Sequence, residues 1–374
     1  MRRASPSTWI IAGLIVAAAL VLGPLSLLAI GLGVGQGFFV GLLMAVLPVP
    51  LYVAFALWVD RFEPEPPWLL VLAFVWGAAI AVFFSLVFNV VHEGLVTELA
   101  GAASASTLTA VLAAPFIEEL TKGAALLLLF FWMRNQFDNV TDGIVYASMV
   151  GLGFAMTENV QYYGQALSEE GGPGAAVVFF LRGILGPFSH PLFTSMTGIG
   201  LGIARETRRA WLKWVAPPIG LGAAMLLHSF WNLSASQGAA FFAAYLVVMV
   251  PAFVAVIVIA IFSLRREARV IRKHLESVVA EGVLSADDLL VLASVTRRLG
   301  ASTQALFSRG PGYWRARRRF HALATELAFH SWRSSREAAA DAQAIQAELR
   351  EAVRAARARL GLPGELVANL VPSA

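Results

Sequence analysis

Two adjacent glutamates, Glu118 and Glu119, precede a lysine, Lys122, inside an otherwise apolar stretch of the chain. On a helix, residues three and four apart lie on one face, so Lys122 can pair with either carboxylate. Two carboxylates in a medium of low dielectric constant do not both ionise freely. A lysine that neutralises one of them leaves the other to accept and release a proton. Lys122 is therefore either a structural ion-pair partner or part of the catalytic site.

Further polar residues interrupt the apolar stretches that follow. His228 and Asn232 are one helical turn apart and present an imidazole and an amide on one face, where they can hold a water, a metal ion or an oxyanion. The adjacent Glu158 and Asn159 fit either a functional role or an interhelical hydrogen-bonded pair. Arg182 lies nearer the outer surface, and we expect its side chain to snorkel toward water.

These residues lie where polar groups are costly. A charge at the centre of a membrane span costs on the order of 2.5–3.5 kcal/mol on insertion scales, so it is a functional candidate by default. The predicted spans that carry them are consecutive, so their side chains can converge on one buried site. The candidate catalytic residues are Glu118, Glu119, Lys122, Glu158, Asn159, His190, His228 and Asn232.

The residue types restrict the chemistry. The chain has no cysteine, which excludes a thiolate zinc site and a cysteine nucleophile. It also has no His-Glu-x-x-His and no Gly-x-Ser-x-Gly. Glutamate, histidine and asparagine can activate water in two ways. Glu118, His190 and His228 could bind zinc with water in the fourth position. Alternatively, Glu118 acts as general base without metal, and His228 and Asn232 stabilise the oxyanion.

The composition indicates the elements that position these residues. The chain has 374 residues, of which 58% are hydrophobic and only 14% charged. We expect an all-α, polytopic transmembrane bundle of about eight spans. The first apolar run is longer than the hydrophobic core of a signal peptide, so we expect it to be retained. The predicted spans are roughly 9–31, 38–59, 68–91, 107–132, 142–163, 175–204, 215–235 and 239–263.

Lysine and arginine set the expected orientation. The loops near 32–37, 92–106, 164–174 and 236–238 contain neither residue, whereas the intervening segments are basic. The positive-inside rule then places both termini in the cytoplasm of a multi-pass protein of the cell (inner or plasma) membrane. We divide the chain into a transmembrane domain, 1–264, and a basic helical cytoplasmic region of unknown role, 265–374. The expected partners are the lipid bilayer and a membrane-protein substrate, and no nucleic acid; the sequence leaves the oligomeric state open.

The pattern of motifs resembles the PrsW family of intramembrane proteases and, more distantly, the type II CAAX prenyl endopeptidase superfamily. That superfamily uses arginine where this chain has Lys122, which favours the narrower family. The resemblance covers about residues 50–235. It rests on Asp60-Arg-Phe-Glu-Pro-Glu-Pro66, Glu118-Glu-x-x-Lys122, Gly151-x-Gly-Phe-Ala-x-x-Glu-Asn159, Ser189-His190 with Gly198, and His228-Ser-Phe-Trp-Asn232.

The resemblance implies hydrolysis of a membrane-associated polypeptide within or beside the bilayer, with an anti-sigma factor as the substrate suggested by the family's namesake. It implies a catalytic core of Glu118 or Glu119 with His190 and His228, and an assisting Asn232. It leaves open whether the peptidase is a zinc metalloprotease or a metal-free, glutamic-type endopeptidase. The alternatives from other classes are a proton-coupled membrane transporter, since buried glutamate, lysine and histidine also build proton relays, and a non-catalytic membrane scaffold.

Overall fold

The computed structural model describes residues 6–186, 188–335 and 342–362, and in these ranges every regular element is a helix. This confirms the all-α prediction. The α-helices are α1 (Pro6–Val34), α2 (Phe38–Val46), α3 (Val49–Val59), α4 (Pro67–Val75), α5 (Val82–Ala100), α6 (Ala102–Leu108), α7 (Ala114–Trp132), α8 (Val140–Phe179), α9 (Ser189–Glu206), α10 (Ala210–Ala235), α11 (Ala240–Ala244), α12 (Val250–Ala280), α13 (Ala286–Leu292), α14 (Val295–Ser334) and α15 (Ala342–Arg359).

Short helical segments of other geometry join some of these helices. Gly35–Gly37 (η1) is a 3₁₀ turn, and four segments are π-helical: Trp76–Ala81 (η2), Thr109–Ala113 (η3), Phe180–Leu185 (η4) and Tyr245–Met249 (η5). Wider π turns inside α-helices are frequent at functional sites. Here η3 leads into α7 and η4 follows α8, and both of these helices carry candidate residues.

The chain forms two compact units. The first comprises Met1–Asp60 and Glu65–Ala260, and the second comprises Arg61–Pro64 and Ile261–Ala374. The helix α12 begins in the first unit and ends in the second. Residues 336–341 and 363–374 of the predicted tail lie outside the described residues, and the division at residue 264 stays a prediction about function.

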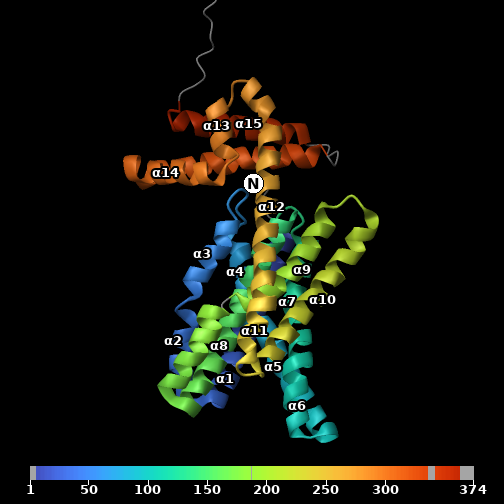
Figure 1. The fold of residues 1–374 in the computed structure, drawn as a ribbon. Helices are drawn as coiled ribbons and strands as arrows, with labels where there is room; N and C mark the ends of the chain where they lie inside the picture. Colours follow the sequence, from blue (N-terminus) through green and yellow to red (C-terminus); the bar gives the residue numbers. More distant parts are fainter. Residues whose placement is uncertain (1–5, 187, 336–341, 363–374) are drawn as a thin grey trace, which may run out of the picture. The chain divides into compact units, whose positions relative to one another are not determined.

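The first unit is a bundle of long apolar helices that run side by side (Figure 1). Among the described residues, five helical stretches are long and apolar enough to cross a membrane: Pro6–Val59, Pro67–Ala100, Val140–Glu206, Ala210–Ala235 and Ala240–Ala280. The helix with Glu118, Glu119 and Lys122 is not among them because three charges lie close together in it. The count of about eight spans therefore stays a prediction.

The outer surface of this bundle is apolar. Leu32, Phe39 and Leu99 expose 79%, 78% and 87% of their surface, and many other large apolar side chains are exposed with them. A soluble monomer rarely exposes contiguous apolar surface on this scale. A bilayer is the solvent that suits such a surface, in agreement with a helical membrane bundle.

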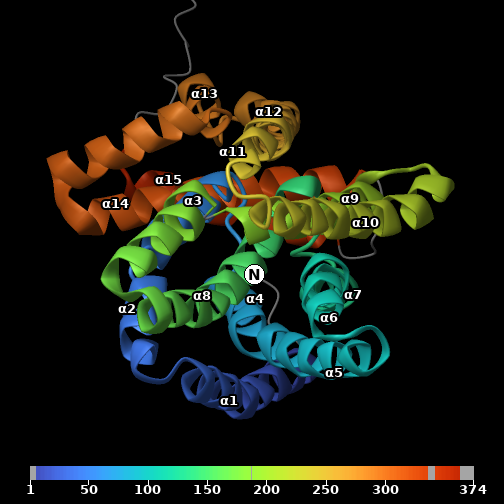
Figure 2. The same ribbon diagram turned by 60° about the horizontal axis from the view of Figure 1, so that its bottom comes forward.

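Two glycines allow α8 and α9 to approach closely. A Cβ atom added at Gly151 would lie 2.7 Å from the backbone nitrogen of Pro191 and 2.8 Å from the carbonyl carbon of His190. A Cβ atom at Gly198 would lie 2.1 Å from the carbonyl oxygen of Gly143. Small residues at such crossings let helix backbones meet. These two glycines of the sequence motifs therefore hold the start of α9, with His190, against α8; Figure 2 shows α9 alongside α10 as well.

The motif that begins at Asp60 forms the turn between α3 and α4. The backbone N–H of Glu65 donates to Oδ2 of Asp60 at 2.9 Å, and the hydroxyl of Tyr146 on α8 donates to Oε2 of Glu65 at 2.5 Å. Burial raises the pKa of Asp60 to about 7, and the hydrogen bond from Glu65 opposes that shift. These contacts attach the turn between α3 and α4 to the N-terminal part of α8, where Tyr146 lies, and give the motif a structural role.

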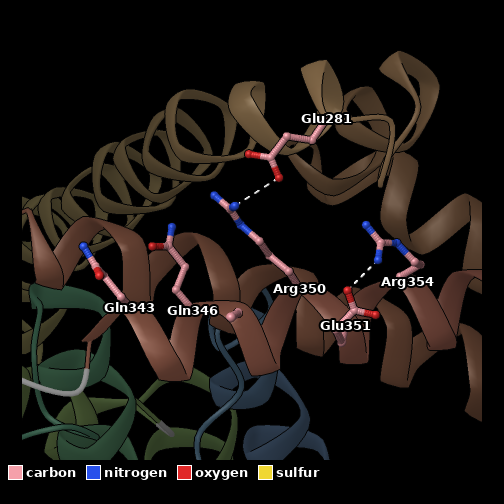
Figure 3. Close-up of a pocket in the computed structure, with 7 residues that line it drawn as sticks. Glu281, Gln343, Gln346, Arg350, Glu351 and Arg354 are labelled. Atoms are coloured by element: carbon pink, nitrogen blue, oxygen red, sulfur yellow. Dashed lines mark hydrogen bonds and ion pairs between the residues drawn. The ribbon is translucent and has the colours of Figure 1, made fainter.

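The second unit has its own core. Apolar side chains from the end of α12 and from α13, α14 and α15 pack together, and Phe62 of the short segment Arg61–Pro64 lies among them with 2% of its surface exposed. Gly310 has φ +78° and marks a bend within α14. A polar surface hollow of about 390 Å³ lies beside α15, where Arg350 and Glu281 form an ion pair of 3.0 Å (Figure 3).

Candidate functional site

A buried ion cluster lies on α7. The ammonium Nζ of Lys122 is 2.8 Å from Oε1 of Glu119 and 3.4 Å from Oε2 of Glu118. The two glutamates and the lysine are all buried, and Lys122 and Glu119 are fully buried. The spacing expected from the sequence therefore produces contacts of Lys122 with both carboxylates. The lysine compensates the charge of one carboxylate, which leaves the other carboxyl group able to accept and release a proton.

His190, at the start of α9, reaches the same cluster. Its Nδ1 lies 2.9 Å from Nζ of Lys122, and its Nε2 lies 2.9 Å from Oε2 of Glu158 on α8. An ammonium group can only donate, so Nδ1 accepts from Lys122. The proton of the neutral imidazole then resides on Nε2 and is donated to Glu158. Both ring nitrogens of His190 are therefore engaged.

His228, on α10, completes the cluster. Its Nδ1 lies 3.1 Å from Oε1 of Glu119, and its Nε2 lies 3.8 Å from Oε2 of Glu118. The ring stacks on Phe193 with centroids 4.9 Å apart. A carboxylate can only accept, so the proton of His228 resides on Nδ1 and its Nε2 lone pair faces Glu118. A carboxylate behind an imidazole is the arrangement that orients many catalytic and metal-binding histidines.

Two residues of this site escaped the sequence analysis. The hydroxyl of Thr194 donates to Oε2 of Glu119 at 3.0 Å, and Thr194 is fully buried. The ring of Phe154 lies 3.9 Å from Nζ of Lys122, measured to its centroid. Thr194 is one helical turn after His190, so its position on the same face as a candidate residue is the signal that could have found it. Phe154 is within a quoted motif but gives no polar signal.

Arg182 is the third residue that sequence reasoning undervalued. Instead of reaching for water, its guanidinium forms an ion pair with Glu158 and donates from Nε to Oδ1 of Asn159 at 2.7 Å. The side chains of Arg182 and Glu158 each expose 17% of their surface. The structure thus joins Glu158, Asn159 and Arg182, and His190 connects them to the cluster on α7.

Asn232 lies at the edge of this arrangement. Its amide donates to the carbonyl oxygen of Ala110, in η3, at 2.8 Å. This bond ties α10 to the segment that leads into α7 and does not involve the carboxylates of the cluster. One further N–H of the amide is left for another acceptor.

The donor set at the centre fits a zinc ion. One ligand atom each from Glu118, His190 and His228 can be chosen so that all three lie within 4.8 Å of one another, and the three residues are buried. Two imidazoles and one glutamate form the ligand set of several zinc hydrolases. His228 offers Nε2 directly. His190 becomes a ligand only when it releases either Lys122 or Glu158.

Comparisons with known proteins identify the family. A family model described as "PrsW family intramembrane metalloprotease" matches residues 65–256. The curated Protease PrsW of Bacillus subtilis (strain 168) is 30% identical over 174 residues, which cover 46% of this chain and 72% of the relative. Protease PrsW of Oceanobacillus iheyensis is 27% identical over 207 residues, which cover 54% of this chain and 84% of that relative. No solved structure matches the chain. The buried glutamates and histidines lie within the matched region, and the chain belongs to the PrsW family of intramembrane proteases.

Proposed function

We propose that this chain hydrolyses a peptide bond of a membrane-associated protein with a water activated by Glu118. The observation that carries the proposal is that ligand atoms of Glu118, His190 and His228 lie within 4.8 Å of one another, beside the ammonium of Lys122. Structural ion pairs inside a membrane need only neutralise each other. This cluster also places a carboxylate oxygen of Glu118 and Nε2 of His228 where both can contact one water, and general base catalysis requires a base within hydrogen-bond reach of the proton that it removes.

In the first step, Oε2 of Glu118 and Nε2 of His228 hold the water between them. Their separation of 3.8 Å allows one water to contact both atoms. Glu118 takes a proton from the water while the water oxygen bonds to the scissile carbonyl carbon. The free N–H of Asn232 polarises the carbonyl oxygen, on which the negative charge develops.

In the second step, the protonated Glu118 returns the proton to the leaving amide nitrogen, and the carbon–nitrogen bond breaks. Glu119 fixes the tautomer of His228 through Nδ1, and Lys122 keeps Glu119 ionised by its 2.8 Å contact. Glu158 acts indirectly, through its contact with His190, and Asn159 accepts from Arg182, which pairs with Glu158. All proton transfers are thereby made by Glu118, which ends each cycle in its starting state.

Zinc is the cofactor that this site would hold, through Glu118, His190 and His228, and Glu118 would then be a ligand in place of its metal-free role as general base. When bound, it would lower the pKa of a coordinated water and polarise the carbonyl of the substrate. Removal of metal tests this part. If zinc is resident, incubation with 1,10-phenanthroline abolishes cleavage and added zinc restores it. Unchanged cleavage after chelation, with no zinc detected by mass spectrometry, assigns the enzyme to the glutamic type.

We infer that the enzyme acts in the cell membrane with both termini in the cytoplasm, because its basic residues lie in alternate loops. The substrate is a membrane-associated polypeptide whose cleavage site enters the bundle. An anti-sigma factor remains the candidate named by family resemblance.

The experiment uses purified chain in proteoliposomes with a fluorogenic peptide of one apolar transmembrane helix, flanked by a fluorophore and a quencher. Glu118→Gln keeps the size of the side chain but cannot accept the proton, so we expect cleavage to fall about 10²–10⁴-fold. Cleavage by His228→Ala should fall by a similar factor. Correct insertion is checked by proteolytic mapping of the loops. Properly inserted variants that cleave like the wild type would show that the base lies elsewhere.

A further inference from the structure

Arg182 occupies an unusual backbone setting. It lies in η4, the π-helical segment that follows α8 and ends shortly before His190. The hydroxyl of Tyr52 donates to the carbonyl of Gly183, and the hydroxyl of Tyr245 donates to the carbonyl of Leu185 at 2.9 Å. Side chains from two other elements therefore hold this segment. A rigid segment of this kind can present one side chain in a fixed direction.

The guanidinium of Arg182 is fixed by three contacts. It pairs with Glu158, donates to Oδ1 of Asn159, and stacks on Tyr162 at 3.7 Å from the ring centroid. Stacking fixes the plane of the guanidinium, while the two polar contacts fix its rotation within that plane. A snorkelling arginine needs none of these restraints, because its aim is to reach water. The contacts instead hold two adjacent acceptors of α8 in place.

Glu158 connects the restrained guanidinium of Arg182 to His190. The same oxygen atom that pairs with Arg182, Oε2, lies 2.9 Å from Nε2 of His190. A carboxylate held there accepts a hydrogen bond from Nε2–H, so the neutral ring carries its proton on Nε2 and none on Nδ1. That nitrogen then accepts from Lys122 at 2.9 Å. The charge and position of Arg182 thus determine which nitrogen of His190 faces the cluster on α7.

We propose that Arg182 is a positioning residue of the protease, which acts through Glu158 to hold His190 with its proton on Nε2 and Nδ1 turned to Lys122. The proposal deepens the proposed function and rests on it for its catalytic consequence. The orientation of His190 itself can be measured without any cleavage. Outer-shell partners of this kind typically contribute 10–100-fold to activity.

The first measurement is the tautomer of His190, read from side-chain ¹⁵N shifts of the histidine-labelled chain in micelles and assigned with His190→Gln. The wild type should show a protonated Nε2 and an unprotonated Nδ1. Arg182→Ala should lose this single tautomer. Arg205→Ala is the matched control, because Arg205 also stacks on a ring, Phe130, and donates to the carbonyl of Phe137 at 3.0 Å. It should leave the His190 signals unchanged.

The second measurement is cleavage of the fluorogenic transmembrane peptide in proteoliposomes. Arg182→Ala should lower kcat/KM about 10–100-fold. Added guanidinium chloride at low, non-denaturing concentration should restore part of the loss in Arg182→Ala and have no such effect on Arg205→Ala. Arg182→Lys should lie between the wild type and Arg182→Ala, because one ammonium cannot serve Glu158 and Asn159 in the same plane.

The outcomes separate this inference from the proposed function. A wild-type His190 spectrum in Arg182→Ala overturns the inference, even if that variant is less active. When Arg182→Ala does not insert, the same spectrum in folded Arg182→Gln, which also lacks the charge, overturns it equally. An altered tautomer together with guanidinium rescue supports it. If the wild type shows the expected tautomer but cleaves no peptide, the positioning role stands and the proposed function fails.

Discussion

Both units of this protein bury charged side chains, but they satisfy those charges differently. In the first unit, Lys122 is fully buried and contacts two carboxylates and an imidazole nitrogen. In the second unit, Arg298 exposes 7% of its surface and donates to the carbonyls of Leu292 and Phe62 at 2.7 and 3.1 Å. It also donates to the hydroxyl of Thr325 at 2.6 Å and stacks on Phe62.

The two environments predict different roles for the two cations: a structural role for Arg298 and a role in catalysis for Lys122. The direct acceptors of Arg298 are neutral groups that cannot exchange protons near neutral pH. Burial lowers the pKa of Arg298 to about 9, with Glu267 opposing the shift, and the guanidinium remains charged at pH 7. The partners of Lys122 are themselves titratable and share donors with one another. A buried charge surrounded by titratable partners is therefore the stronger candidate for catalysis.

The largest expected effect follows from Lys122→Met. This change leaves Glu118 and Glu119 buried without their cation, so we expect about 3–5 kcal/mol of destabilisation and loss of cleavage. Unfolding in mixed detergent–SDS micelles, followed by circular dichroism, measures the stability. Lys213→Met is the control, because Lys213 is exposed. A Lys122→Met protein as stable as the control would mean that the cluster is not held together by this charge.

Arg298→Met should cost less, about 1–3 kcal/mol in local stability, because the acceptors that it leaves unpaired are mainly neutral. Hydrogen exchange of peptides from α13 and α14 reports the change. Cleavage per folded molecule should stay near the wild-type value. Arg297→Met, at an exposed neighbouring position, serves as control. If Arg298→Met abolished cleavage while exchange in the second unit stayed unchanged, the contrast between the two buried charges would fail.

His321 gives the second unit a pH dependence. Burial, with help from Arg298, Arg317 and Arg318, lowers the pKa of His321 to about 3, below its usual value of 6.5. The neutral ring is thus favoured in the folded unit. Its stabilising contribution is complete above pH 6.5 and falls by about 1.4 kcal/mol per pH unit as the pH drops from there toward 3.

Hydrogen exchange of α14, corrected for intrinsic rates, should therefore show weaker protection at pH 5.5 than at pH 7.5. His321→Leu should remove most of that difference, because leucine does not titrate. An equal loss of protection in both proteins would assign the pH dependence to other groups.

The smallest effect is expected at the surface of the second unit. Glu281 and Arg350 form an ion pair with 42% and 30% of their side-chain surfaces exposed. Solvent screens such pairs, which contribute about 0–1 kcal/mol. Glu281→Gln should therefore leave the rate of cleavage unchanged and lower the stability measured by hydrogen exchange by no more than about 1 kcal/mol. A larger effect would give the hollow shown in Figure 3 a role that its exposure does not suggest.

Much of the candidate site could be predicted from the spacing of residues along the sequence. The three- and four-residue separations of Glu118, Glu119 and Lys122 dictate neighbouring positions on one helix, and the ion pairs form there. The helical class follows similarly from long apolar runs. The partners of Arg182 and Thr194 could not be assigned in this way, because they lie 24 and 75 residues away. No helical period connects residues at such separations.

The sequence by itself determined an all-helical membrane protein, the polar residues that its spans must bury, and its PrsW family. These are consequences of hydrophobicity, helical periodicity and motif spacing, which are local properties. Only the tertiary structure decided which nitrogen of each histidine faces which carboxylate, and that Arg182 holds Glu158. Those choices depend on close helix crossings, such as that of Gly151 with His190 at the start of α9, where an added Cβ atom would lie only 2.7–2.9 Å from the backbone of the other helix, so the crossing fixes the register between distant segments.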